Sequence, residues 1–218
     1  MNRKRIGIIM GIIALFFSPA LGNSQTPKQT SEPQGFSRLL QEVDQSFQKA
    51  RENFLAKKWK DSAEAIRRGK SYLQSEATRA EDKSKEALAS SAQELQRLAD
   101  KVEKGATKSV RELDSAFSRA NSALAQYYYR MANESWAQKE ASKAGHELLA
   151  ATFQLEKGIR RAEGKVEREV QSVVQKTDRL AGKMIEGTKV AEGEVEKGIQ
   201  DLGKEIEKLG KKVEKLGR

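Results

Sequence analysis

Residues 109–156 read SVRELDSAFSRANSALAQYYYRMANESWAQKEASKAGHELLAATFQLE, and no other part of the chain carries so much large apolar surface at helical spacing. Apolar residues that recur every three or four positions share one face of an α-helix. Such a face has to be covered, so we expect the other helices of the protein to pack against it. The face consists of Leu113, Phe117, Ala120, Leu124, Tyr127, Tyr128 and Met131.

The apolar face changes direction after Trp136. Two interpretations are open: the helix breaks between Ala137 and Ser142, or its second half is buried on two sides. Both place this stretch at the centre of the fold. The rotated face consists of Ala144, Leu148, Ala151 and Leu155, while Leu149 and Phe153 continue the earlier one.

Upstream, residues 36–54 carry apolar side chains at alternating spacings of four and three, which predicts a helix. Trp59 is out of phase with its apolar face, so the helix is expected to end near Lys57. Asp61 and Glu64 have the spacing of a capping box, which predicts that the next helix starts at Asp61.

The apolar phase of this next helix continues without a break through residues 61–103. Because no Gly or Pro interrupts it, we favour one continuous helix, although two helices joined at Thr78 fit the same pattern. Gly105 predicts its C-terminus. Ser109 and Glu112 form a second capping box, which opens the central helix.

These patterns predict an all-α protein with no β-sheet, because period-2 alternation is absent from the chain. Short turns between long helices make consecutive helices antiparallel. We therefore expect an antiparallel bundle of three to five long helices over residues 36–157, followed by one long amphipathic C-terminal helix in the tail, residues 158–218.

The N-terminus has the organisation of a secretory signal peptide over residues 1–22. A basic segment precedes the apolar run Ile6–Phe17, which is too short to span a bilayer as a helix, and Ala20-Leu21-Gly22 offers small residues for cleavage. Residues 23–35 are rich in polar residues and Pro, and predict a disordered linker. We expect an exported protein, located in a bacterial periplasm.

The chain is basic, with 41 Lys or Arg and 31 Asp or Glu. Without Arg3, Lys4 and Arg5 the basic count is 38, and the net charge is +7. Export disfavours a nucleic-acid partner and makes anionic lipid headgroups or cell-wall polymers the expected acidic partners. The absence of Cys means that an exported chain must rely on its hydrophobic core for stability.

The sequence predicts neither an enzyme nor a cofactor or metal site. His146 is the single histidine and Cys is absent, which excludes a Cys nucleophile, a zinc site built from Cys or several His, and a di-iron site with two Glu-x-x-His pairs. We interpret His146 as a partly exposed helix residue.

A dense basic cluster follows the first predicted helix. It could contact an anionic membrane or a cell-wall polymer, because a Trp supplies contact area and the lysines supply charge attraction. The alternative is a Trp that closes the end of the bundle among solvated lysines. The cluster consists of Lys57, Lys58, Trp59, Lys60, Arg67 and Arg68.

Tyr129 and Trp136 lie seven residues apart and share a second face of the central helix. This face either packs against the first helix or forms a docking site for a ligand or peptide. Aromatic residues at helical spacing usually serve packing, which favours the first interpretation.

The end of the tail has a heptad pattern, with Ile or Val at a and Leu at d, which favours two-stranded packing. Gly203, Gly210 and Gly217 at e leave room for close approach of a second helix. Lys204 and Lys211 lie opposite the apolar stripe, whereas a membrane-lying helix places lysines at its edges. The stripe consists of Ile199, Leu202, Ile206, Leu209, Val213 and Leu216.

In composition, this Gly- and Lys-containing tail resembles exchangeable apolipoproteins and desiccation-related proteins. We expect an exported, non-enzymatic scaffold or adaptor that interacts through its C-terminal amphipathic helix, with itself or with a partner helix over residues 190–218. The alternative is an envelope protein that binds anionic lipid or cell-wall polymer through the tail and the Lys57–Lys60 cluster.

The expected export can be tested on the mature protein. Mass spectrometry of the secreted chain should find an N-terminus at or near Asn23. Retention of Met1 would contradict the signal-peptide prediction.

Overall fold

The computed structural model describes residues 33–107 and 109–216, and within them every regular element is a helix, with no strand. The predicted all-α class is therefore confirmed. The predicted signal peptide and the linker up to residue 32 lie outside the described residues. The helices are α1 (Pro33–Leu55), α2 (Trp59–Arg79), α3 (Asp82–Glu103), α4 (Val110–Ala137), α5 (Ala141–Glu163), α6 (Arg168–Ile185) and α7 (Glu192–Leu216).

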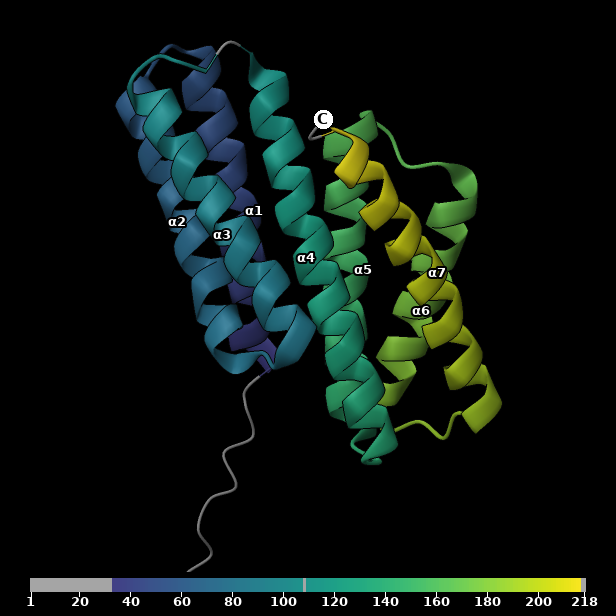
Figure 1. Ribbon diagram of the computed structural model, residues 1–218. Coiled ribbons are helices and arrows are strands. Elements are labelled where there is room, and N and C mark those ends of the chain that lie inside the picture. Colours follow the sequence, from purple (N-terminus) through teal and green to yellow (C-terminus); the bar gives the residue numbers. More distant parts are fainter. Residues whose placement is uncertain (1–32, 108, 217–218) are drawn as a thin grey trace, which may run out of the picture. The chain divides into compact units, whose positions relative to one another are not determined.

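Two antiparallel four-helix bundles share α4 (Figure 1). In the first bundle, α1 packs on α2, α2 on α3, α3 on α4, and α4 on α1. In the second bundle, α4 packs on α5, α5 on α6, α6 on α7, and α7 returns to α4. Short turns connect successive helices, so each runs antiparallel to the one before it.

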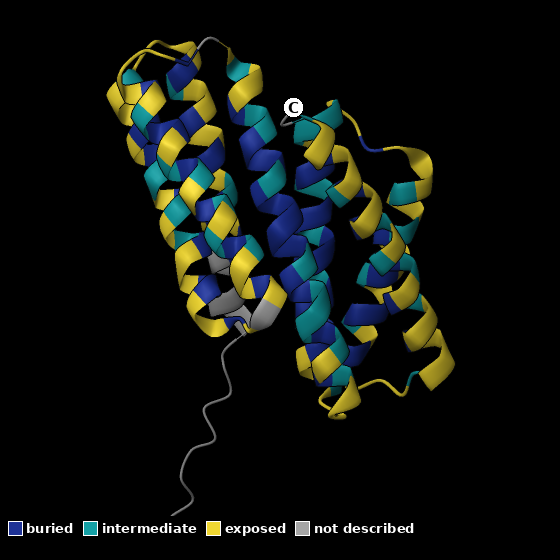
Figure 2. Cartoon of the chain, viewed as in Figure 1, coloured by how far each residue is buried: buried dark blue, intermediate teal, exposed yellow. Residues whose placement is uncertain are grey.

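The shared helix α4 is buried along much of its length (Figure 2). One face presents Phe117 and Leu124 to the first bundle, and both side chains are fully buried. Another face carries small and polar residues, among them Ser118, whose hydroxyl donates a hydrogen bond of 2.8 Å to the Gly158 carbonyl of α5. Small residues allow the backbones of α4 and α5 to approach closely.

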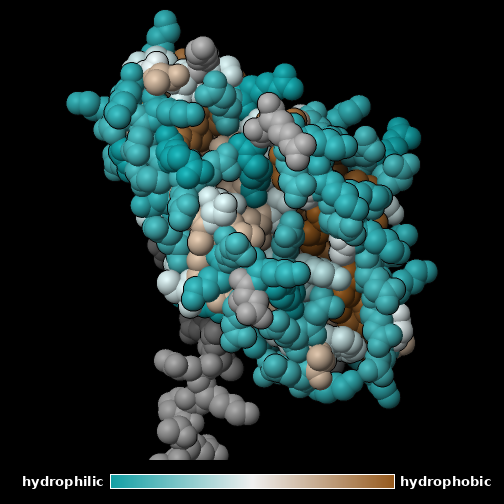
Figure 3. All heavy atoms as spheres, in the orientation of Figure 1, coloured by the Kyte–Doolittle hydropathy of each residue, from teal (hydrophilic) through white to brown (hydrophobic). Residues whose placement is uncertain are grey.

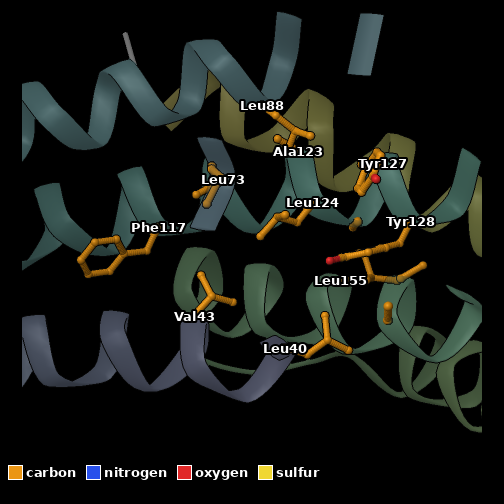
Figure 4. Close-up of a cluster of buried hydrophobic side chains, with 14 of the residues drawn as sticks. Leu40, Val43, Leu73, Leu88, Phe117, Ala123, Leu124, Tyr127, Tyr128 and Leu155 are labelled. Atoms are coloured by element: carbon orange, nitrogen blue, oxygen red, sulfur yellow. The ribbon is translucent and has the colours of Figure 1, made fainter. Parts of the chain in front are cut away.

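The first bundle is closed by aromatic and branched side chains around α4. The Phe47 ring of α1 stacks on Phe117, with 4.4 Å between ring centroids. Gly69 of α2 makes room for this pair, because a Cβ there would lie 2.4 Å from the Phe47 ring. Leu73 of α2 and Leu88 of α3 are fully buried close to α4 (Figure 4).

The prediction of one continuous helix over residues 61–103 is wrong, and the alternative of two helices is right. The chain turns at Ala80 and Glu81, both of which have extended backbone dihedrals. Extended dihedrals are open to any residue, so the turn needs neither Gly nor Pro. The reversal lets the apolar faces of α2 and α3 enter the same core, which the Ala- and Ser-rich segment between them could not fill alone.

Of the two interpretations left open for residues 109–156, the break between Ala137 and Ser142 is present. The helix α4 ends at Ala137 and α5 begins at Ala141. Lys139 occupies the left-handed region at φ 63°, and the Glu140 N–H donates to the Ser135 carbonyl at 2.9 Å. This arrangement is a Schellman turn formed without glycine.

Two of the predicted helix starts need correction in detail. The helix α2 begins at Trp59, and the predicted capping box at Asp61 is not formed. Ser109 does precede α4, but its side chain makes no capping hydrogen bond. Gly105 ends α3 as predicted, in the left-handed region at φ 66°.

The tail consists of two helices, α6 and α7, in place of the single long helix predicted. Gly187 has φ 71° and terminates α6 with a Schellman turn, in which the Thr188 N–H donates to the Lys183 carbonyl at 2.9 Å. The predicted boundary between bundle and tail, at residues 157 and 158, lies inside α5. Residues 31–218 form one compact unit.

Close packing of α5 on α6 can be tested with two glycines. A Cβ at Gly145 would lie 2.8 Å from the Ala181 carbonyl oxygen, whereas a Cβ at Gly182 would meet nothing within 4 Å. Gly145→Ala should lower the free energy of unfolding by about 1–3 kcal/mol, because the α6 backbone at Ala181 cannot move away without disturbing the packing of that helix. Gly182→Ala, the matched control, should raise it by up to about 1 kcal/mol. Equal effects in urea unfolding would contradict the packing described.

Candidate functional site

The turn between α1 and α2 contains the basic cluster predicted from the sequence. Lys57 adopts a left-handed conformation at φ 59°, and the Lys58 N–H donates to the Asn53 carbonyl at 2.8 Å. A left-handed conformation costs a non-glycine residue roughly 1–2 kcal/mol. Where glycine would fit without strain, the chain carries a lysine, and the turn displays it to solvent.

Leu55, at the last position of α1, is 57% exposed. It is the one large hydrophobic residue that is exposed among the residues whose burial the structure describes. Trp59 is half-buried and packs edge-to-face on Phe54, with ring centroids 5.1 Å apart. Sequence reasoning did not single out Leu55, although its position next to Phe54, outside the apolar face, was the available signal.

The six residues of the predicted cluster divide into two groups. Lys57, Lys58 and Lys60 are exposed and form no ion pair with any described carboxylate. Arg67 instead bridges to Asp100 at 3.0 Å and to Glu103 at 2.5 Å on α3, which ties α2 to α3.

Arg68 pairs with Glu64, one turn earlier on α2, at 3.0 Å. Both arginines are therefore committed to carboxylates of the protein. The three lysines of the turn are the part of the cluster that is left for an external anion.

The face of α4 that carries Tyr129 and Trp136 was expected to pack against the first helix, with a docking site as the alternative; at Tyr129 it is covered by α7 instead. Tyr129 lies against Gly203, where a Cβ would be 2.5 Å from the phenol oxygen. Beside this contact, a groove of about 880 Å³ runs between α4 and α7. Trp136 is half-buried at the α4–α5 turn, with the Lys139 ammonium 5.7 Å from its ring centroid.

The apolar stripe of the tail faces the chain's own helices. The helix α7 packs on α4, α5 and α6. Gly203 and Gly210 allow the close approach expected of them, and the helix that approaches is α4, through Tyr129 and Gln126. Ile199, Leu202, Ile206, Leu209 and Val213 are buried, and Leu216 is half-buried.

A cluster of buried tyrosines and a carboxylate lies between α2 and α4. The Tyr72 and Tyr128 hydroxyls are 2.6 Å apart, and burial raises the pKa of Tyr72. Burial also raises the pKa of Glu76, despite its ion pair with Arg79 at 3.3 Å. These groups hold charge poorly, and Tyr72 also lines a groove of about 560 Å³ between α1 and α2.

A second polar cluster joins α1 to α5. Asp44 receives Lys157 at 2.7 Å and Arg161 at 2.6 Å. Burial alone would raise the pKa of Asp44, but the hydrogen bonds and charges of Lys157 and Arg161 bring it below its ordinary value. Arg161 also donates to the buried Asn121 amide oxygen at 2.8 Å. This cluster cross-links three helices, so its role is structural.

Within residues 33–107 and 109–216, no three His, Asp or Glu side chains lie close enough together to hold a metal ion. In the same residues, no helix combines the length and hydrophobicity needed to cross a bilayer. His146 is half-buried on α5, and burial lowers its pKa.

Comparison of the chain with protein-family models, curated protein sequences and solved structures finds no match. The assignment of function therefore rests on the geometry of the surface.

The two kinds of buried carboxylate predict opposite pH effects. The pKa of Glu76 is raised, so its charge destabilises the fold above that pKa, and the penalty is relieved as the pH falls towards 4.5. Glu76→Gln should therefore stabilise the protein at pH 7, with a gain that shrinks on acidification. The free energy of urea unfolding at several pH values measures this gain.

Asp44 is the matched control, because its pKa is lowered. Its charge stabilises the fold above its ordinary pKa, and that stability is lost as the pH falls through the folded value. Asp44→Asn should therefore destabilise at pH 7 and lose its effect only in stronger acid. A Glu76→Gln variant that is less stable than the parent at pH 7 would refute the assignment.

Proposed function

We propose that the protein is an exported, non-enzymatic helical protein of the bacterial envelope that binds an anionic surface through its α1–α2 turn. The observation that carries this proposal is the exposure of Leu55 next to Lys57, Lys58 and Lys60, none of which pairs with a described carboxylate. Phosphate-bearing lipid and cell-wall polymer both offer the charge that such lysines attract.

The arrangement of the turn supports binding more than it supports packing. A leucine buried inside the protein would stabilise the fold by about 1.5–3 kcal/mol, and this gain is forgone at Leu55. A turn under selection for stability alone would bury the leucine.

A second candidate is the scaffold or adaptor that interacts through α7. The observation that favours it is the regular heptad pattern of α7. The half-buried Tyr129 contacts α7 at Gly203. In the folded chain the stripe is already covered, so α7 would have to leave α4 before it could pair with a second copy or a partner helix. This requirement makes the surface-binding proposal the better supported of the two.

Surface binding predicts a specific loss in a triple variant. Changing Lys57, Lys58 and Lys60 together to Gln should weaken binding to anionic vesicles, because about 1 kcal/mol is expected per basic residue near the surface. Added salt should weaken the parent in the same direction. Co-sedimentation of residues 31–218 with phosphatidylglycerol-containing vesicles measures both effects.

The control makes the same change in net charge elsewhere. Lys83, Lys85 and Lys189 are exposed on the α2–α3 and α6–α7 side of the protein, and their change to Gln should leave binding nearly intact. If both triple variants lose the same affinity, net charge explains the binding and the α1–α2 turn is not the site.

The adaptor candidate predicts that a looser α7 promotes association. Gly203→Ala would crowd the Tyr129 ring and weaken the seat of α7. Sedimentation velocity should then show more dimer than in the parent or in the Gly182→Ala control. A strictly monomeric Gly203→Ala variant at high concentration would argue against self-association through α7.

A further inference from the structure

Four segments that are distant in the sequence lie at the same end of the helices, the end that holds the α1–α2 turn. The α3–α4 turn, the α5–α6 turn and the last turn of α7 lie at this end (Figure 1). We call it the basic end. It comprises residues 55–61, 100–107, 109–112, 160–169 and 208–216.

Charge is distributed unequally between the two ends. The basic end carries 14 Lys or Arg and eight Asp or Glu. The turn segments of the opposite end, residues 76–86, 134–147 and 183–196, carry seven basic and 11 acidic residues. The alternation of helix direction therefore sorts a dispersed charge pattern into a positive and a negative end.

A smaller share of the cations form ion pairs at the basic end than at the opposite end. At the opposite end, Lys139 pairs with Glu192 at 2.9 Å, and Lys183 pairs with Glu194 at 3.4 Å. At the basic end, many cations form no ion pair with any described residue. They are Lys57, Lys58, Lys60, Lys101, Lys104, Arg111, Lys165, Arg168 and Lys215.

A groove at the same end brings some of these cations together with one more, Arg97. It has a volume of about 480 Å³ and lies between α3, α4 and the end of α7. Arg97, Lys101 and Arg111 line it without a described ion-pair partner, Arg119 is held by Glu94, and Glu112 also lines it. Attraction to an anionic surface thus extends beyond the α1–α2 turn.

We infer that the protein stands end-on on an anionic phospholipid bilayer, with the basic end against the headgroups and Leu55 entering the interface. This inference rests on the proposed function and specifies its partner and its orientation. A lipid is favoured over a soluble polyanion because of Leu55. A polyanion has no apolar region for the exposed Leu55 side chain to enter, whereas a bilayer lets the leucine reach acyl chains below the headgroups.

The packing of α7 excludes an orientation in which α7 lies in the plane of the membrane. A helix that lies in the membrane plane must turn its apolar face to the lipid. Leu202 and Leu209 of α7 are instead buried against the protein. In the folded chain, α7 can meet a bilayer only with its end, which agrees with the end-on orientation.

The chain offers an internal pair of reporters for the orientation. Trp59 lies at the basic end and Trp136 lies at the α4–α5 turn of the opposite end, and both are half-buried (Figure 1). Residues 31–218 contain both and form one compact unit. This fragment also omits the apolar run of residues 6–17, which would bind vesicles by itself.

The test uses vesicles of phosphatidylcholine with phosphatidylglycerol in which part of the lipid carries brominated acyl chains. Trp136→Phe leaves Trp59 as the reporter, and Trp59→Phe leaves Trp136. Bromine should quench Trp59 and leave Trp136 unaffected. Equal quenching of the two reporters, or stronger quenching of Trp136, would overturn the end-on orientation.

Leu55 provides the second arm. Leu55→Ser should weaken vesicle binding by about tenfold, the effect of withdrawing much of one leucine from an apolar environment. Its matched control, Ala137→Ser, changes an exposed residue of the opposite end and should have no effect. Binding to soluble polyphosphate should be insensitive to Leu55→Ser.

The outcomes separate the inference from the proposed function. If the parent protein binds neither vesicles nor polyphosphate, the proposed function is refuted, and the inference with it. If the parent binds polyphosphate as tightly as it binds vesicles, and Leu55→Ser does not weaken vesicle binding, the partner is a polymer and only the inference is overturned. Quenching confined to Trp59 that diminishes in Leu55→Ser would establish the end-on bilayer contact.

Discussion

Burial of α4 from two sides is the constraint on which the rest of the structure depends. A helix on the edge of one bundle needs one apolar face, but α4 lies on the edges of two. It meets this demand with large residues such as Phe117 on one face and small ones such as Ser118 on another. The small face brings α5 close enough for the Ser118 hydroxyl to reach the backbone of Gly158.

The same constraint explains the state of the tail. The second bundle is complete only when α7 returns to α4, and the glycines of α7 permit this contact. The apolar stripe of α7, which resembles one half of an intermolecular coiled coil, is thereby buried against helices of the same chain. The face of the molecule in Figure 3 is largely hydrophilic, and apolar residues show mainly in the gaps between helices. This leaves an isolated exposed residue such as Leu55 as the more informative feature.

Topology also decides the electrostatic character of the protein. Along the sequence, acidic and basic residues are mixed, and the local patterns suggest little beyond solvated helix faces. The seven antiparallel helices of the described residues place every second turn at the same end, so modest biases in separate turns accumulate. Favourable placement of cations near helix C-termini contributes to this, because α1, α3, α5 and α7 all end there. The resulting dipolar arrangement supplies a direction in which the protein can approach an anionic surface.

The sequence by itself determined the helical class, the central position of residues 109–156 and the ends of several helices, because periodicity and left-handed residues such as Gly105 act locally. It also located the Lys57–Lys60 cluster, since adjacent charges need no fold to be found. Only the tertiary structure decided between one helix and two over residues 61–103, because the extended dihedrals at Ala80 are open to any residue. The structure likewise decided that Arg67 is neutralised by α3 and that the stripe of α7 is covered by α4. These outcomes depend on contacts between residues far apart in the chain, and a periodic pattern specifies that a face must be buried without specifying what buries it.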